Sequence, residues 1–352
     1  MKTFDLYTAN EYPFLQGDAD FLLAASLTLT CNIKGITQAG IPGHIPLTPI
    51  LDAEFLETGS VYSLEGIAET ATGIPTPGLI TRAVHLLSPF KKISTLNLGL
   101  QTPPQHCNVH DFDIPATPSI ADAVAFDAQD VFEKGRAFGR TYTLSGDYLI
   151  LGESTPAGTT TAQASAMALG IESRGLFASS FKDSPIAIKE FAISASLAKL
   201  NDAMNPFERL GHTADNTLLF SAGFMIEASK RFNVVLGGGT QMACALLVAE
   251  HLARFTDTSC DFGRIHLATT AWIAKDAASS ITALLQHLHT LPNAFYTDFS
   301  FADAAIAVLK LYDQGEAKEG VGAGAALAYA GTHGIGTQKL TRKIEALMQG
   351  NT

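Results

Sequence analysis

Three short apolar runs, each followed by a loop of small residues and then by a helical pattern, dominate the second half of the chain. The apolar runs are residues 147–151, 233–236 and 264–268. Continuous apolar runs of this length are typical of strands that are buried on both faces of a sheet. The helical patterns that follow them cover residues 161–169, 242–253 and the segment after Ala274. Three such units in succession predict right-handed crossovers and a parallel sheet flanked by helices, a Rossmann-like three-layer α/β fold.

The first half of the chain has a weaker pattern, which proline and glycine interrupt. Residues 47–56 predict a short helix between two turns, and residues 102–118, with four prolines and no period, predict a loop. Residues 119–136 predict a helix that Ser119 caps. Its apolar stripe consists of Ile120, Val124, Ala128, Val131 and Phe132.

A last apolar segment, residues 299–311, leads to a glycine-rich stretch at residues 319–324. Since no repeat of fixed period interrupts the chain, we expect one large α/β domain over residues 1–352. Within it, a small helical subdomain could combine the N-terminal segment, about residues 1–60, with a C-terminal helix at about residues 336–350.

The composition narrows the class of partner. Hydrophobic residues make up 47% of the chain and charged residues 16%, enough to build a sizeable core. The formal net charge is -11, which repels nucleic acid and anionic membranes. We therefore expect small-molecule substrates, with no nucleic acid and no membrane as partners.

The cysteines and the N-terminus are typical of a cytoplasmic protein. The four cysteines form no C-x-x-C pair, and we interpret them as reduced, mostly buried thiols. The N-terminus lacks the basic-then-apolar pattern of a signal peptide, and apolar stretches such as residues 243–248 fall well short of the ~20 residues that span a bilayer. We expect a cytoplasmic protein.

The loop after the first apolar run has the features of an anion site. In an open parallel sheet, ligands bind beyond the carboxyl ends of the strands. Gly152 and Gly158 allow tight turns that bring backbone N–H groups near a ligand. Thr159 and Thr160, with the threonine after them, open a helix, so their amides and hydroxyls face an anion at its positive end. An ordinary N-capped turn is the alternative.

A second loop has three consecutive glycines, which cost backbone entropy. A close approach of the backbone to a ligand, or to a neighbouring element, would justify that cost. Its candidate binding residues are Gly237, Gly238, Gly239 and Thr240. Gly320 and Gly322 belong to a similar run, residues 320–324, but Ala325 breaks the G-x-G-x-x-G pattern. The missing dinucleotide fingerprint disfavours an NAD-dependent oxidoreductase, and since no P-loop motif occurs, a P-loop nucleotide site is disfavoured as well.

Two glutamates, Glu153 and Glu319, stand directly beside these glycine-rich loops. A carboxylate there would repel a phosphate, so it should face a hydroxyl, a proton or a cation. Ribose hydroxyls suit a carboxylate acceptor, and a partly buried glutamate with a raised pKa suits general-base work. A solvated loop acid is the alternative for each. Together the loops predict a site for a phosphorylated ribose compound.

Metal binding has little support in the sequence. The group His106, Cys107, His110, Asp111 and Asp113 lies in the proline-rich loop without standard ligand spacing. No Asp-Asp pair occurs, which argues against a magnesium-dependent pyrophosphate donor. We expect no metal and no cofactor.

At these loops the chain resembles a known family, the nicotinate-nucleotide:dimethylbenzimidazole phosphoribosyltransferases, in its archaeal- and cyanobacterial-type branch. The motifs that carry the resemblance are Gly152-Glu153-x5-Thr159-Thr160, residues 236–242 and residues 318–324. Further similar segments are residues 25–26, 35–43 and 49–55, so the resemblance touches most of the chain.

The resemblance implies a homodimeric transferase with a parallel α/β fold. Its reaction moves phosphoribose from nicotinate mononucleotide to an aromatic base, in making the lower ligand of cobamides. By the same resemblance Glu319 is the general base, Glu153 lies by the ribose, and the glycine-rich loops hold the phosphate. The accepting base stays open between a benzimidazole and a purine.

The chain departs from the family pattern at a few positions. Ala157 replaces a usual glycine, and Lys318 and Val321 replace a glycine and a serine. These changes leave open a nucleotide-binding or regulatory homologue without turnover. A phosphate-pairing lysine is expected after the Gly/Thr helix; Lys182 lies in that region, and we interpret it as a surface lysine.

Overall fold

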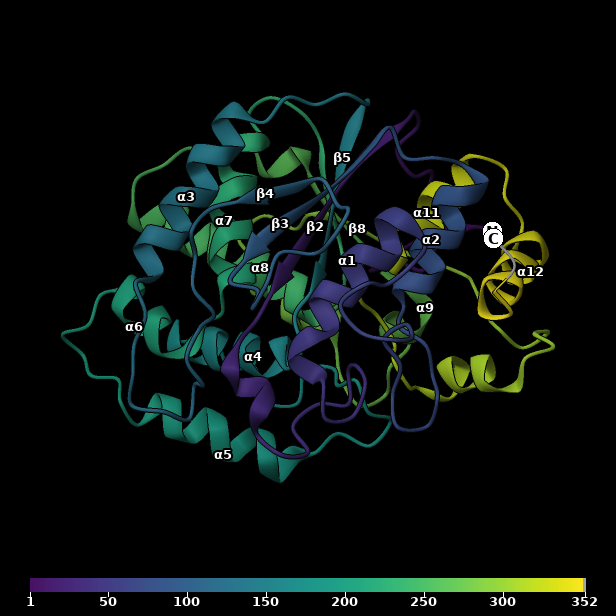
Figure 1. Ribbon diagram of the computed structural model, residues 1–352. Coiled ribbons are helices and arrows are strands. Elements are labelled where there is room, and N and C mark those ends of the chain that lie inside the picture. Colours follow the sequence, from purple (N-terminus) through teal and green to yellow (C-terminus); the bar gives the residue numbers. More distant parts are fainter. Residues whose placement is uncertain (351–352) are drawn as a thin grey trace.

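The computed structural model, which describes residues 1–350, contains one eight-stranded sheet of order β1-β8-β7-β6-β5-β2-β3-β4 (Figure 1). All neighbouring strands are parallel except β1, which pairs antiparallel with β8 at one edge. The strands are β1 Thr3–Asp5, β2 Ala19–Ser26, β3 Lys92–Leu98, β4 Val109–Asp111, β5 Tyr148–Ser154, β6 Val234–Gly237, β7 Ile265–Thr270 and β8 Asn293–Thr297. The predicted α/β fold is confirmed.

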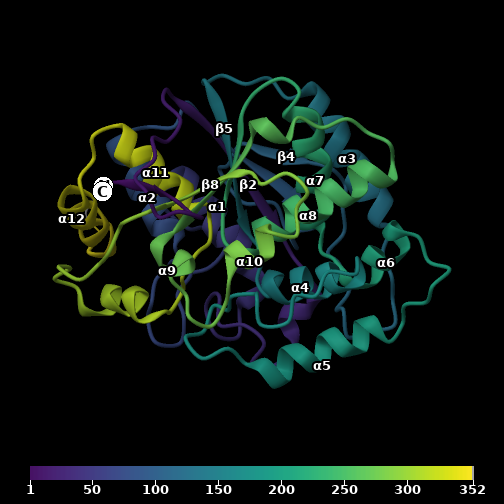
Figure 2. The same ribbon diagram turned by 180° about the vertical axis from the view of Figure 1, so that it is seen from behind.

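Helices cover both faces of the sheet. Figures 1 and 2 show α3, α6 and α7 on one side and α2, α11 and α12 on the other. The α-helices are α1 Thr48–Thr58, α2 Gly78–Leu87, α3 Ala128–Thr141, α4 Gly158–Ala168, α5 Ile186–Leu197, α6 Pro206–Thr213, α7 Asn216–Ala228, α8 Thr240–Phe255, α9 Ala271–Ala274, α10 Ile281–Leu285, α11 Ala323–Thr332 and α12 Thr337–Met348.

Strand β5 shows why a continuous apolar run marks an interior strand. Leu149 and Leu151 point into the core beneath α3, α7 and α8, whereas Ile150 points into the opposite core beneath α2 and α11. Successive side chains of a strand alternate between faces, so a strand covered on both sides needs apolar residues throughout. Burying each of these side chains stabilises the fold by roughly 1.5–3 kcal/mol.

The helix expected over residues 119–136 begins only at Ala128. The Asp127 side chain caps α3 by accepting a hydrogen bond of 2.9 Å from the amide of Asp130, so the prediction that Ser119 caps this helix is wrong. The expected apolar stripe is correct from Ala128 onward, but Val124 is 61% exposed. Ile120 is instead buried against Leu27 in a separate small cluster. The predicted stripe therefore joined residues of α3 to residues of the preceding loop.

Two further expectations are corrected. The loop predicted over residues 102–118 contains β4, a three-residue edge strand that pairs in parallel with β3. The helix expected after Ala274 is split, because α9 ends there and α10 begins at Ile281. In contrast, α1 confirms the helix expected over residues 47–56.

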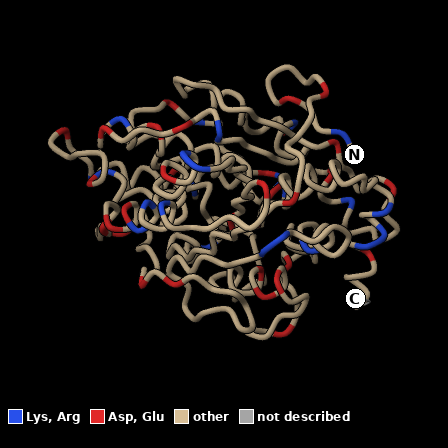
Figure 3. The backbone as a smooth tube through the Cα atoms, turned by 90° about the horizontal axis from the view of Figure 1, so that it is seen from above, with Lys and Arg blue, Asp and Glu red and all other residues tan. Residues whose placement is uncertain are grey.

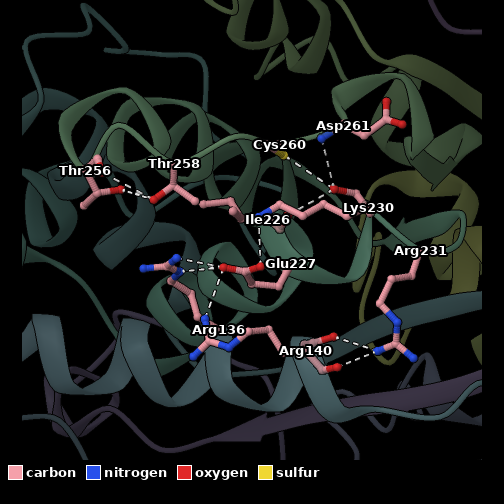
Figure 4. Close-up of polar contacts among 12 residues, drawn as sticks. Arg136, Arg140, Ile226, Glu227, Lys230, Arg231, Thr256, Thr258, Cys260 and Asp261 are labelled. Carbon is pink, nitrogen blue, oxygen red and sulfur yellow. Dashed lines mark hydrogen bonds and ion pairs between the residues drawn. The ribbon is translucent and has the colours of Figure 1, made fainter.

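Helices α3 and α7 are joined by a buried carboxylate (Figure 4). Glu227, on α7, accepts hydrogen bonds from Arg136 at 2.8 Å, from Arg140 at 3.2 Å and from Lys230 at 2.8 Å. Gly135 allows the close crossing, since a Cβ there would lie 2.2 Å from the carbonyl oxygen of Phe220. This pair of helices packs over one face of the sheet.

The N-terminal segment belongs to the sheet, and the C-terminal helix packs on its helical layer. Residues 1–60 supply β1 at one edge and β2 inside the sheet, and α12 packs on α2. The domain division, with or without a small helical subdomain, stays a prediction. Figure 3 shows acidic and basic residues interspersed around the trace. None of the helices in residues 1–350 combines the length and apolar character needed to cross a bilayer.

Candidate active site

The three glycine-rich loops meet in one cavity at the carboxyl ends of β5, β6 and β7. Residues 153–159, 239–241 and 317–321 line it, together with residues 68–70 and 74–77 from the first half of the chain. The position is the one expected for a ligand in a parallel α/β sheet.

The Glu319 carboxylate is held by four hydrogen-bond donors. One oxygen accepts from the amides of Gly320 at 3.2 Å and Gly324 at 3.1 Å. The other accepts from the amide of Thr270 at 3.0 Å and the hydroxyl of Thr269 at 3.3 Å. Burial nevertheless outweighs these bonds and raises the pKa of Glu319 to about 7. A fixed carboxyl group with a pKa near neutrality is suited to taking up a proton.

Glu153, at the end of β5, lines the same cavity and is only 8% exposed. Burial raises the pKa of Glu153 to about 8, and the neighbouring carboxylates of Glu319, Asp215 and Asp52 contribute to that rise. Since like charges cannot all ionise cheaply in a buried site, the protonated form of Glu153 is favoured near neutral pH. The pKa of Glu319, about 7, is the lower of the two, so Glu319 is the first of the pair to ionise as pH rises.

The predicted binding residues fall into two groups. Five of them line the cavity: Gly158, Thr159, Gly239, Thr240 and Gly320. The other five lie outside the lining: Gly152, Thr160, Gly237, Gly238 and Gly322. Whether any of them binds substrate stays a prediction.

Three glycines of the second group have a packing reason for their small size. A Cβ on Gly152 would lie 3.0 Å from the amide nitrogen of Gly322, and a Cβ on Gly237 would lie 3.0 Å from the Cα of Gly322. The ends of β5 and β6 thus approach the loop before α11 backbone to backbone. These glycines therefore allow a close approach to a neighbouring element of the fold.

The helix starts of α4 and α8 lie side by side at one wall of the cavity. The Gln241 side chain, in the first turn of α8, packs over Gly158 at the start of α4, where a Cβ would lie 2.1 Å from its Oε1. Gln241 is 4% exposed, and its Nε2 has no hydrogen-bond partner among the described residues. Two positive helix ends and an unused amide donor at one wall suit an anionic group.

Two buried lysines add positive charge near this wall. Lys189, on α5, is 4% exposed and donates a hydrogen bond of 3.2 Å to the carbonyl of Ala178, which lines the cavity. Burial and the charge of Lys318 lower the pKa of Lys189 to about 8. Lys318 also lines the cavity and pairs with Asp276 at 2.9 Å. Lys189 makes no ion pair within the described part of the chain, so its charge can be met by a ligand.

Sequence reasoning missed Lys189 and considered Lys182, which is exposed. The signal that could have identified Lys189 is its place in an apolar helical segment, where a lone lysine must be buried or paired. Asp52 was missed in the same way, since it stands in the apolar pattern of α1 yet lines the cavity.

The possible metal ligands of the proline-rich loop, residues 106–113, make other contacts. The side chain of Asp111, for example, accepts a hydrogen bond of 2.9 Å from that of Asn97. Over residues 1–350 no three His, Cys, Asp or Glu residues come together as metal ligands.

Comparison with known proteins gives the family. No family model matches the chain. A UPF0284 protein of Archaeoglobus fulgidus is 33% identical over 334 residues, which cover 94% of this chain and 93% of the relative. The chain belongs to the UPF0284 family. Another UPF0284 protein, from Thermococcus gammatolerans, is 31% identical over 334 residues, with 93% of this chain and 96% of the relative covered.

Solved structures share the fold of this UPF0284 chain. A nicotinate-nucleotide–dimethylbenzimidazole phosphoribosyltransferase of Thermus thermophilus matches with a TM-score of 0.59 and 16% identity, covering 95% of this chain and 86% of that one. A structure of CobT from the same organism matches with a TM-score of 0.60 and 17% identity, covering 97% and 88%. The resemblance noted from the loop motifs is thus accompanied by a common architecture over nearly the whole chain.

Proposed function

We propose that this UPF0284 chain is a phosphoribosyltransferase that moves phosphoribose from nicotinate mononucleotide to an aromatic base, a benzimidazole or a purine. The observation that carries the proposal is that a buried carboxyl group and two helix starts line one cavity. Glu319, with its pKa near 7, and the starts of α4 and α8 all line it, and Lys189 lies behind the lining residue Ala178. The fold shared with two phosphoribosyltransferase structures supports the same reaction class.

The positive wall suits the phosphate of the mononucleotide. The amide of Thr159 lies in the first turn of α4, where no carbonyl of the helix itself can accept from it, and Gln241 offers its unused Nε2. Lys189 supplies a cation that pairs with no carboxylate of residues 1–350. A monophosphate held in this way needs no metal bridge, because such donors and one buried cation can balance its charge.

The carboxyl group of Glu319 suits the transfer step. The C1′–N bond to the cationic pyridinium breaks and its electron pair stays on the nicotinate nitrogen, so the departing ring is neutral at that atom and needs no general acid. The attacking ring nitrogen of the base forms the new bond to C1′. Its other nitrogen gives up a proton to Glu319, which must be ionised before the step.

Glu153 complements Glu319 in this scheme. Burial raises the pKa of Glu153 to about 8, so its protonated form can donate a hydrogen bond to a ribose oxygen while adding no charge beside the phosphate. The neighbouring ionised Glu319 then stabilises positive charge that develops on the ribose as the pyridinium departs. We place the reaction in the synthesis of the cobamide lower ligand.

A homodimer is part of the proposal. Helix α5 leaves Ile186 68% and Phe191 64% exposed, which makes its outer face a candidate contact surface. Light scattering of the purified chain tests the assembly.

The direct test is a transfer assay. The purified chain is incubated with nicotinate mononucleotide and a panel of benzimidazoles and purines, and nicotinate release is followed together with the mass of the new riboside phosphate. We expect release with at least one base. No release with any of them, under conditions where the nucleotide binds, would overturn the enzymatic proposal.

One observation favours a second candidate, a nucleotide-binding homologue without turnover. The Glu319 carboxylate already accepts four hydrogen bonds from its own surroundings, as a purely structural carboxylate would. Under this alternative, calorimetry detects nucleotide binding, and no product forms in the transfer assay. Glu319→Gln then leaves the heat of binding unchanged.

A further inference from the structure

A third buried carboxylate, Asp52, lies in the cavity wall with two hydroxyl groups. It is 3% exposed and projects from α1. Its Oδ1 accepts a hydrogen bond of 2.7 Å from Thr76, and its Oδ2 accepts one of 2.6 Å from Ser154. All three residues line the cavity. No part of the proposed transfer step uses them.

The direction of these hydrogen bonds is fixed by the charge of Asp52. Burial raises the pKa of Asp52 to about 6, while the two hydroxyl donors act against that rise, so the group is ionised above about pH 6. An ionised carboxylate only accepts hydrogen bonds. The single hydroxyl protons of Ser154 and Thr76 are therefore both committed to Asp52.

A hydroxyl whose proton is committed can offer only its lone pairs. Thr76 already uses one lone pair to accept from the amide of Gly78 at 3.1 Å. Ser154 Oγ accepts no hydrogen bond from any described residue, although it is 5% exposed and lines the cavity. Ser154 is thus a pre-set acceptor, and the group that meets it must be a donor.

The location of Ser154 selects the donor. Residues 153–159 line the cavity as one continuous segment, from Glu153 to the start of α4. A phosphate at the start of α4 places the attached sugar next to the earlier residues of this segment, because a single methylene separates the phosphate ester from the ribose ring. The donor that reaches Ser154 is then a sugar hydroxyl.

We propose that Asp52 is a positioning residue that turns Ser154 into an acceptor for a ribose hydroxyl, so that the site prefers ribosyl over deoxyribosyl ligands. This inference rests on the proposed function, which supplies the ribosyl ligand. It adds a specificity for the sugar that the transfer chemistry alone does not require. If Asp52 only linked α1 to β5, the site would bind ribosyl and deoxyribosyl ligands equally well.

The test is calorimetry of the full chain at pH 7.5 with nicotinate mononucleotide and with its 2′-deoxy and 3′-deoxy analogues. For the wild type we expect roughly tenfold weaker binding of at least one analogue, as for a lost hydrogen bond that leaves a buried acceptor unmet. Ser154→Ala should bind the ribosyl ligand about as weakly as that analogue and lose the preference. Ser221→Ala, a buried serine of α7 outside the cavity lining, should keep it.

Asp52→Asn tests the positioning role without changing the size of the side chain. The amide offers one acceptor and one NH2 group in place of two acceptors, so one of the two hydroxyls must reverse. Thr76 already accepts from the amide of Gly78, whereas both lone pairs of Ser154 are free, so the NH2 group should face Ser154 and the preference should shrink by several-fold. An unchanged preference in this variant overturns the role of Asp52. Equal wild-type binding of all three ligands overturns the inference and leaves the proposed function standing, whereas no wild-type binding of any of them overturns both.

Discussion

The main-chain amide of Val321 donates a hydrogen bond of 2.7 Å to the main-chain carbonyl of Glu153. This bond fastens the loop before α11 to the end of β5, so Glu153 and Glu319 line one cavity although they are far apart in the sequence. Val321 adopts a left-handed φ of 52°, which is unusual and strained for a β-branched residue. Its carbonyl also accepts from the Thr81 hydroxyl at 2.8 Å, and its side chain is 2% exposed. Packing and two hydrogen bonds hold the strained residue.

Replacing Glu319 with glutamine should remove the proton acceptor and keep the size of the side chain, although its NH2 group then faces main-chain amides that the carboxylate accepted from. We expect turnover to fall by roughly 10²–10⁴, the usual range for a lost general base. Affinity for nicotinate mononucleotide should change little. Nicotinate release and calorimetry measure the two effects, and Glu172→Gln, at a side chain that is 73% exposed, is the control. Turnover that survives in the Glu319 variant would show that another group takes the proton.

The pH dependence of kcat/KM should report the same group. Because burial raises the pKa of Glu319 to about 7, and because its ionised form is the active one, kcat/KM should rise with pH as this group ionises around pH 7. Rates of the wild type measured from about pH 5.5 to 7.5 test this. A profile that is flat across this window contradicts the assignment.

Glu153 should make the fold less stable as pH rises, because folding raises the pKa of this group. Its pKa is 4.5 when unfolded and about 8 when folded, so between these values the folded state binds more protons and stability falls as pH rises. Glu153→Gln removes the ionisable group and should stabilise the chain at pH 8.5 by on the order of 2 kcal/mol. Near pH 4.5 the effect should be small. Urea unfolding at both pH values measures it, and a larger gain at the lower pH would contradict the raised pKa.

Lys189 should contribute to binding the phosphate. Lys189→Met keeps the length of the buried side chain but removes its charge, and we expect the Kd of nicotinate mononucleotide to rise roughly tenfold to a hundredfold. Ribose 5-phosphate should be affected in the same proportion. Lys182→Met removes an exposed lysine from the same region and is the matched control. Equal effects of the two substitutions would show that Lys189 has no special contact with the ligand.

Gly322 should tolerate no side chain. Its φ is 68°, and a Cβ would lie 2.8 Å from the ring of Phe21. Gly334 has a similar φ of 71° with no atom within 4 Å of its added Cβ, so Gly334→Ala isolates the cost of the backbone conformation. We expect Gly322→Ala to lower the free energy of unfolding by about 1–3 kcal/mol more than Gly334→Ala. Equal losses in denaturant titrations would mean that the contact with Phe21 relaxes freely.

The sequence by itself determined the strand–loop–helix units of the second half, the cavity loops that follow β5 and β6, and the two glutamates beside them. These features are local. A buried strand needs an unbroken apolar run, and a parallel sheet brings the loops after its strands to one edge, so Glu153 could be placed from its neighbours alone.

The tertiary structure decided what depends on distant partners. Residues 109–111 form a strand only because β3 offers an open edge, and α3 starts at Ala128 because Asp127 captures an amide of its first turn. Lys189 and Asp52 stand in apolar helical segments, where local pattern says only that they are exceptions. Their roles come from what packs against them: a burial that shifts a pKa, or a hydroxyl from another strand, is a property of the folded neighbourhood that no short window of residues contains.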